Sequence, residues 1–255
     1  MTIVEAIAER ERSVLVAALI VIPLLCWAWI VPMARDMYGP MTGASAWMMT
    51  PVWDTRHLAL LFAMWTVMMI AMMLPSVAPT MLIYAAVMRR SEYGHRAALR
   101  VYPMAAGYLT VWVAFGLAAT VLQRLLSRTL ALSSMMKLMS PAGGGALLIV
   151  AAVYQITPLK RACLTHCQSP AAFIAMRLSR GESSPFRLGL RHGMRCLGCC
   201  WTLMLLLFVG GVMNLAVIVA LTVFVLLEKL LPGGWIGSWA SAVLFIVAAA
   251  WIATH

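Results

Sequence analysis

The feature that most constrains the fold is a series of apolar segments, several of which run for roughly 18 residues or more. A helix of that length can cross the hydrocarbon core of a bilayer, which is about 30 Å thick. The apolar runs are continuous and do not alternate with polar residues, which argues against a membrane β-barrel. With 64% hydrophobic and 11% charged residues, the chain is predicted to be all-α, a polytopic transmembrane helix bundle.

The apolar segments predict a single transmembrane domain over residues 1–255 with six or seven spans. The expected helices cover about 13–33, 57–87, 101–123, 142–157, 196–211, 213–231 and 235–253. The block 196–231 is too long to cross once, so Gly210, Gly211 and Asn214 are expected to separate two short helices. One long, kinked helix is the alternative. Pro75 and Pro79 are expected to kink the second helix or to end its regular part.

The distribution of Lys and Arg predicts the orientation of the bundle. Most of these residues lie in two connections, 88–100 and 158–195. Both fall on the side of the N-terminus when helices alternate, and the positive-inside rule places that side in the cytoplasm. We therefore expect a multi-pass protein of a bacterial inner (cytoplasmic) membrane, with a cytoplasmic N-terminus and a cytoplasmic loop at 158–195. Within that loop, residues 170–180 could form a short surface helix.

The net charge of +11 is interpreted as a signal of topology and of anionic lipid head groups. The expected partner is the lipid bilayer, with partner membrane subunits or a metal chaperone as further possibilities, and no nucleic acid. The segments 34–56 and 124–140 are then expected to face outward. Both contain several methionines, and 124–140 is amphipathic enough to lie in the interface.

Five of the six cysteines occur in two short clusters near the predicted membrane surfaces. The first contains Cys163 and Cys167, and the second contains Cys196, Cys199 and Cys200. On a helix, residues three or four positions apart share a face, and paired thiols at these spacings are typical of ligands for a thiophilic metal. The second cluster is expected to open a helix, whose N-terminus would favour the thiolate form.

Two histidines near these clusters are candidate additional ligands. His166 directly precedes Cys167, and His192 lies four residues before Cys196. A solvated loop histidine is the alternative for each of them. For the cysteines, the alternatives are small buried residues at helix ends or a disulfide, which would require the opposite topology.

The second expected helix contains five closely spaced methionines. They are Met64, Met68, Met69, Met72 and Met73. Three of them are four residues apart and form one stripe, and the other two lie on the neighbouring face. A thioether is a neutral, soft ligand that suits Cu(I) and suits zinc poorly, so the stripe could pass a monovalent cation through an apolar layer. Packing is the alternative, because methionine is a common packing residue.

Signatures of common enzymes are missing from the sequence. It contains no nucleophile elbow, no phosphate-binding loop, no dinucleotide fingerprint and no pair of carboxylates placed for acid–base work. A hydrolase or an ATP-driven pump is therefore unsupported. Glu228 and Lys229, which are adjacent near the end of the block 196–231, are expected to anchor a helix at the interface and to point to different faces.

Five motifs follow the order found in a known family. They are Met68-Met69-Ile70-Ala71-Met72-Met73-Leu74-Pro75-Ser76, Cys163-xxx-Cys167, Cys196-xx-Cys199-Cys200-Trp201, Gly210-Gly211-Val212-Met213-Asn214 and Glu228-Lys229. Over roughly residues 57–231 the chain resembles bacterial integral membrane proteins predicted to bind metal, which are sometimes labelled copper chaperones. This resemblance implies metal binding and membrane embedding, and it supplies no mechanism.

Three functional hypotheses follow. The first is a membrane protein that handles a soft metal, most simply Cu(I), by transport or delivery through the methionine stripe and the cytoplasmic thiols. The second is an accessory or structural subunit of a larger membrane complex, with the cysteines holding a structural zinc. The third is a thiol redox protein, for which the adjacent Cys199 and Cys200 would be the reactive pair.

Overall fold

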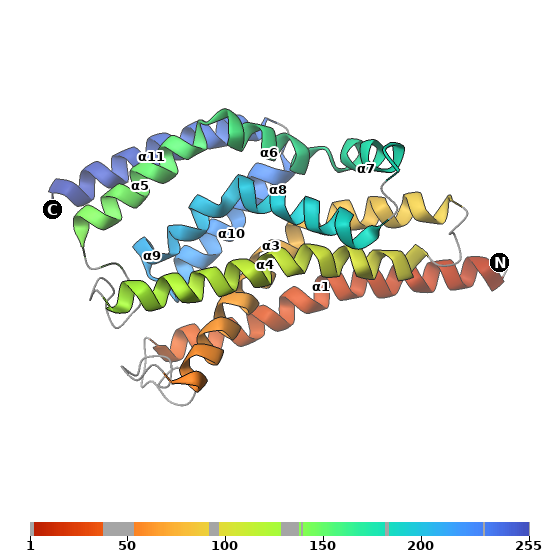
Figure 1. Ribbon diagram of the computed structural model, residues 1–255, viewed down its shortest axis with the longest axis horizontal. Coiled ribbons are helices and arrows are strands. Elements are labelled where there is room, and N and C mark those ends of the chain that lie inside the picture. Colours follow the sequence, from red (N-terminus) through yellow and green to blue (C-terminus); the bar gives the residue numbers. More distant parts are fainter. Residues whose placement is uncertain are drawn as a thin grey trace.

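The structure is a computed structural model that describes residues 3–37, 54–91, 97–128, 138, 140–181, 184–231 and 233–254. All the regular elements in these ranges are helices (Figure 1). They are α1 (Ile3–Met37), α3 (Thr55–Arg89), α4 (Ala97–Arg128), α5 (Pro141–Gln155), α6 (Pro158–Gln168), α7 (Pro170–Ser179), α8 (Pro185–Leu205), α9 (Leu207–Gly210), α10 (Leu215–Leu230) and α11 (Gly234–Thr254). The all-α prediction is confirmed.

The expected helices at 57–87, 142–157 and 235–253 closely match α3, α5 and α11. Those at 13–33 and 101–123 are the central parts of the longer α1 and α4. The prolines do not end α3, which continues through Pro75 and Pro79, and its two halves run in different directions in Figure 1. The methionine-bearing parts of 34–56 beyond Met37 and of 124–140 beyond Arg128 lie outside the described residues.

The break predicted within 196–231 is confirmed, and its cause is local. Gly211 has a φ of +94°, in the left-handed region that favours glycine. Asn214 then caps α10, because its side-chain oxygen accepts hydrogen bonds from the backbone N–H groups of Ala216 at 3.1 Å and Val217 at 3.4 Å.

The prediction of a loop over residues 158–195 is wrong, because most of this segment is helical. It contains α6, α7 and the first turns of α8. Each of these helices begins with a proline that follows Ser or Thr, at Thr157, Ser169 and Ser184. Proline is favoured at the first helical position because it has no N–H to leave unpaired. The side chains of Thr157 and Ser184 also accept backbone hydrogen bonds in the first turns of α6 and α8. The expected surface helix at 170–180 corresponds to α7.

The lengths of the helices give five or six candidate spans, compared with the six or seven expected from the sequence. In the described part of the chain, five helical segments are long and apolar enough to cross a membrane, and a sixth span results if α5 and α6, bent by 64°, are counted as one. Alone, α10 falls short, because about 20 residues are needed to cross. Apolar side chains cover the exposed faces of α1 and α11. The long apolar helices are therefore compatible with a membrane protein.

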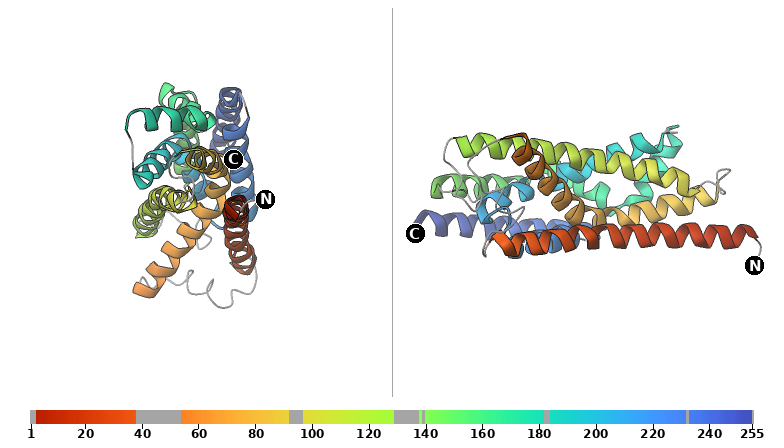
Figure 2. Two further views of the ribbon diagram at one scale, coloured as in Figure 1. Left: turned by 90° about the vertical axis from the view of Figure 1, so that its right-hand side faces the viewer. Right: turned by 90° about the horizontal axis from the view of Figure 1, so that it is seen from below.

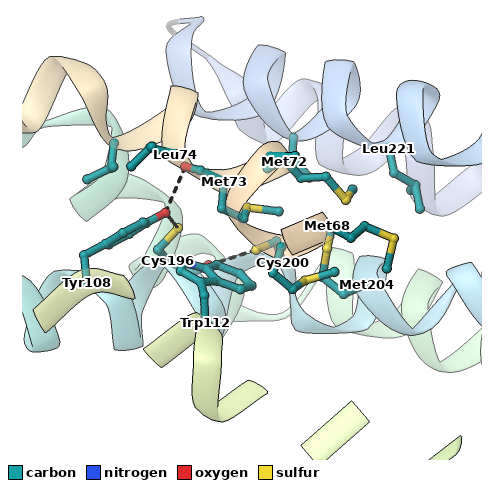
Figure 3. Packing of buried hydrophobic residues seen from close by; sticks show 14 of the residues in the cluster. Met68, Met72, Met73, Leu74, Tyr108, Trp112, Cys196, Cys200, Met204 and Leu221 are labelled. Carbon is teal, nitrogen blue, oxygen red and sulfur yellow. Dashed lines mark hydrogen bonds between the residues drawn. The ribbon is translucent and has the colours of Figure 1, made fainter. Parts of the chain in front are cut away.

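The core lies where α3 meets its neighbours. Helix α3 packs against α1 and α4, α4 packs against α8, and α5 lies alongside α11. Figure 2 shows the first half of α3 crossing the bundle at a steep angle to the long, straight α1. This arrangement leaves the middle of α3 enclosed, with its methionines facing α8 and α10 (Figure 3).

Candidate metal site

The cysteines of the second cluster lie in the interior of α8. Cys196, Cys199 and Cys200 are each at most 1% exposed, and the thiols of Cys199 and Cys200 donate to the carbonyl oxygen of Cys196 at 3.1 and 3.0 Å. The expectation that they open a helix is wrong, because α8 begins at Pro185, about three turns earlier. The dipole of a helix N-terminus therefore does not act on these thiols. They lie near the middle of a candidate span and not at its surface.

The cysteines of the first cluster come from α6, which packs on α8. The Cys167 thiol lies near the thiols of Cys196 and Cys199. Cys163 lies against Gly198, where an added Cβ would be 3.0 Å from the Cys163 sulfur. The structure thus brings together thiols that are about 30 positions apart in the chain and leaves all six cysteines as free thiols.

A buried amine completes the surroundings of Cys196. The Nζ atom of Lys229 lies 2.8 Å from the Cys196 sulfur, 3.4 Å from Ser76 Oγ and 3.7 Å from the Met73 sulfur. The Tyr108 hydroxyl lies 3.1 Å from the Cys196 sulfur and 3.0 Å from the Met73 carbonyl oxygen (Figure 3). Side chains of α4 and α10 therefore contact the Cys196 thiol directly, and both of them also contact α3.

Neither Glu228 nor Lys229 is an interface anchor as predicted, since each is only 4% exposed. They do point to different faces of α10, as expected. Glu228 forms an ion pair with Lys160 of α6 at 2.7 Å and accepts a hydrogen bond from Ser238 of α11 at 2.8 Å. Gln155, at the end of α5, contacts both Lys160 and Glu228. This polar network holds α6 against α10, next to the cysteines of α6.

The two histidines predicted as additional metal ligands differ in burial. His192 is buried in α8, with its ring centroid 5.3 Å from that of Phe173 and 6.0 Å from that of Tyr108. It lies one turn before Cys196 on the same face of α8. The ring of His166 is instead near the surface of α6, where Nδ1 contacts the Ala162 carbonyl oxygen at 2.8 Å. The structure thus places His192, and not His166, beside the thiols of α8.

The five methionines of the predicted stripe are completely buried. Figure 3 shows Met68, Met72 and Met73 of α3 in the same layer as Cys196 and Cys200 of α8. Met204 of α8, which was not predicted from the sequence to be part of the site, lies in this layer and is also buried. It is four residues after Cys200, and this helical spacing could have revealed it.

Glycines set the distance between α4 and α8. A Cβ atom at Gly189 would overlap the Met104 carbonyl oxygen, and one at Gly107 would overlap the Phe186 carbonyl oxygen. Small residues allow such close contact of membrane helices. The contact lies about two turns from Cys196 along α8 and brings Tyr108 within reach of its sulfur.

The donor set fits a soft cation better than a hard one. The thiols of α6 and α8 lie near the thioethers of α3 and α8 (Figure 3), and such sulfur ligands select Cu(I) over oxygen-loving cations. The described residues, as they are positioned, include no group of three or more His, Cys, Asp or Glu side chains arranged to hold a metal ion. The site is therefore a cluster of neighbouring sulfur donors and not a formed coordination shell.

Comparison with known proteins agrees with this donor set. Residues 62–252 match the family model described as "PpoB2: Copper chaperone". Searches of curated proteins and of solved structures find no match. Because the matched region covers most of the chain, the protein belongs to this copper chaperone family.

Proposed function

We propose that the protein binds Cu(I) within the membrane at the thiols of α6 and α8 and transfers it by transport or delivery. The observation that carries the proposal is the packing of α6 on α8, which brings Cys163 and Cys167 beside the thiols of α8. Membership in a copper chaperone family supports copper handling. Cu(I) suits such a site, because it prefers soft thiolate and thioether ligands.

We propose further that the methionines form a path for the metal ion along the bundle. Met68 and Met72 lie on α3, one turn apart, and Met204 and Cys200 lie one turn apart on α8, facing them (Figure 3). Neutral thioethers could pass a monovalent ion along the helices without burying a fixed charge for every step. In this proposal the thiols hold the ion and the methionines carry it along the bundle.

The proposed setting is a bacterial inner membrane, with a multi-pass chain in contact with the lipid bilayer. Exposed apolar side chains on α1 and α11 support this setting. Release of Cu(I) to a thiol-bearing metal chaperone or to a partner membrane subunit would complete delivery. Direct transfer of Cu(I) from a thiol of this chain to a thiol of the partner would keep the ion away from water at each step.

The test is the metal content of the full chain, purified under reducing conditions after expression with copper. The variant replaces Cys196, Cys199 and Cys200 by Ser, and Cys26→Ser is the matched control because Cys26 lies on α1, away from the two clusters. We expect close to one bound copper in the wild type and the control, and loss of most copper in the triple variant.

Three outcomes would contradict the proposal. Unchanged copper in the triple variant would exclude the α8 thiols as the site. Tetrahedral zinc by X-ray absorption, together with stable copurification of a membrane partner, would favour the accessory subunit with a structural zinc. A reversible disulfide that forms without bound metal would instead favour thiol redox chemistry.

A further inference from the structure

Lys229 is a buried cation that has no carboxylate at ion-pair distance among the described residues. The adjacent carboxylate, Glu228, points away and pairs with Lys160. An isolated buried charge is costly, so a buried ammonium needs a compensating anion. The nearest atom that can supply one is the sulfur of Cys196, 2.8 Å away.

The other contacts of Lys229 are neutral. Ser76 Oγ and the Met73 sulfur lie 3.4 and 3.7 Å from Nζ, and both can solvate an ammonium without cancelling its charge. The ammonium group of Lys229 therefore places a positive charge at the edge of the sulfur cluster. Because the side chain is only 4% exposed, water and salt screen this charge weakly.

We propose that Lys229 determines the charge selectivity of the thiol site, so that a soft monovalent cation is favoured over a soft divalent one. This inference rests on the proposed function, and it adds a selectivity residue that none of the sulfur motifs contains. It predicts a role for an amine in a site whose ligands are all sulfur.

The balance of charge at the site favours the monovalent ion. Two thiolates and one monovalent cation carry a net charge of −1, which the ammonium neutralises. The same thiolates with a divalent cation are already neutral, and the ammonium then leaves an uncompensated positive charge in an apolar layer. Coulomb repulsion between the ammonium and the bound ion also doubles when the ionic charge doubles. Both effects act against the divalent ion.

The experiment compares Ag(I) and Cd(II), which are both soft and differ by one unit of charge. The full chain in detergent is titrated with each ion under reducing, anaerobic conditions, and the dissociation constants are obtained by competition with a chelator. The variants are Lys229→Gln and Lys229→Leu, so that one remains if the other fails to fold. Thr222→Val is the control, since Thr222 is a buried residue two turns earlier on α10 and carries no charge.

We expect each neutral variant to shift the affinity ratio toward Cd(II) by at least about tenfold relative to the wild type. Thr222→Val should leave the ratio within about twofold. An unchanged ratio in a folded Lys229 variant that still binds both ions would overturn the inference, and so would an equal loss of both affinities. If the wild type binds neither ion, the proposed function itself fails.

Discussion

At the scale of single residues, the Lys160–Glu228 ion pair joins α6 to α10. Both side chains are nearly inaccessible, and loss of one partner from a buried pair costs about 3–5 kcal/mol because the other charge is left uncompensated. We expect Lys160→Met and Glu228→Gln each to lower the thermal unfolding temperature in detergent. The double variant should be more stable than the sum of the two losses predicts, as a double-mutant cycle would measure.

The same pair links stability to the thiols, because α6 also contains Cys163 and Cys167. Strictly additive effects in the double variant would mean that the two charges do not interact.

The sequence alone indicated that Glu228 and Lys229 point to different faces. It could not reveal that both are buried, because the partners Lys160 and Cys196 are 68 and 33 positions away and only the packing brings them close.

At the scale of helices, the glycine contact between α4 and α8 sets the position of Tyr108. Gly189→Ala would place a Cβ against the Met104 carbonyl oxygen, and we expect it to destabilise the fold by about 1–3 kcal/mol, as overpacking typically does. The control is Gly145→Ala on α5, where the nearest atom to an added Cβ is 4.0 Å away. That change should be neutral or stabilising by up to about 1 kcal/mol.

Thermal unfolding followed by tryptophan fluorescence separates the two glycine variants. Equal stability of both would mean that α4 and α8 can move apart without cost. If the close contact positions Tyr108, then Gly189→Ala should also weaken copper retention, while Gly145→Ala should not.

The helices themselves show which sequence signals are strong and which are easily missed. Apolar length was sufficient to predict α3, α5 and α11, because a membrane helix needs a long apolar run and little else. Apolar length did not predict the helices within residues 158–195, where frequent Arg residues suggested a loop. The helix starts there are set by Ser or Thr followed by Pro, a local signal that hydrophobicity does not contain. As a result, Cys196 was expected at the start of a helix and lies inside one.

At the scale of the whole molecule, arginines from two segments far apart in the chain gather at one end of the bundle. Figure 1 places the N-terminus, the end of α3, the start of α4 and α7 at one end, and the C-terminus at the other. The first end contains a group of arginines from both basic segments: Arg89, Arg90, Arg100, Arg177 and Arg180. Because positive residues are retained in the cytoplasm, we expect this end to be the cytoplasmic one.

The orientation gives a prediction that distinguishes the possible span counts. With the basic end in the cytoplasm, the C-terminus at the opposite end should face outward, as an odd number of crossings requires. We expect a C-terminal alkaline phosphatase fusion to be active and a C-terminal green fluorescent protein fusion to be dark, with the reverse result for fusions placed after Arg180. A cytoplasmic site after Arg180 requires the α5–α6 pair to cross. A fluorescent C-terminal fusion would then show that α10 does not cross, so that the number of crossings is even and the C-terminus lies in the cytoplasm.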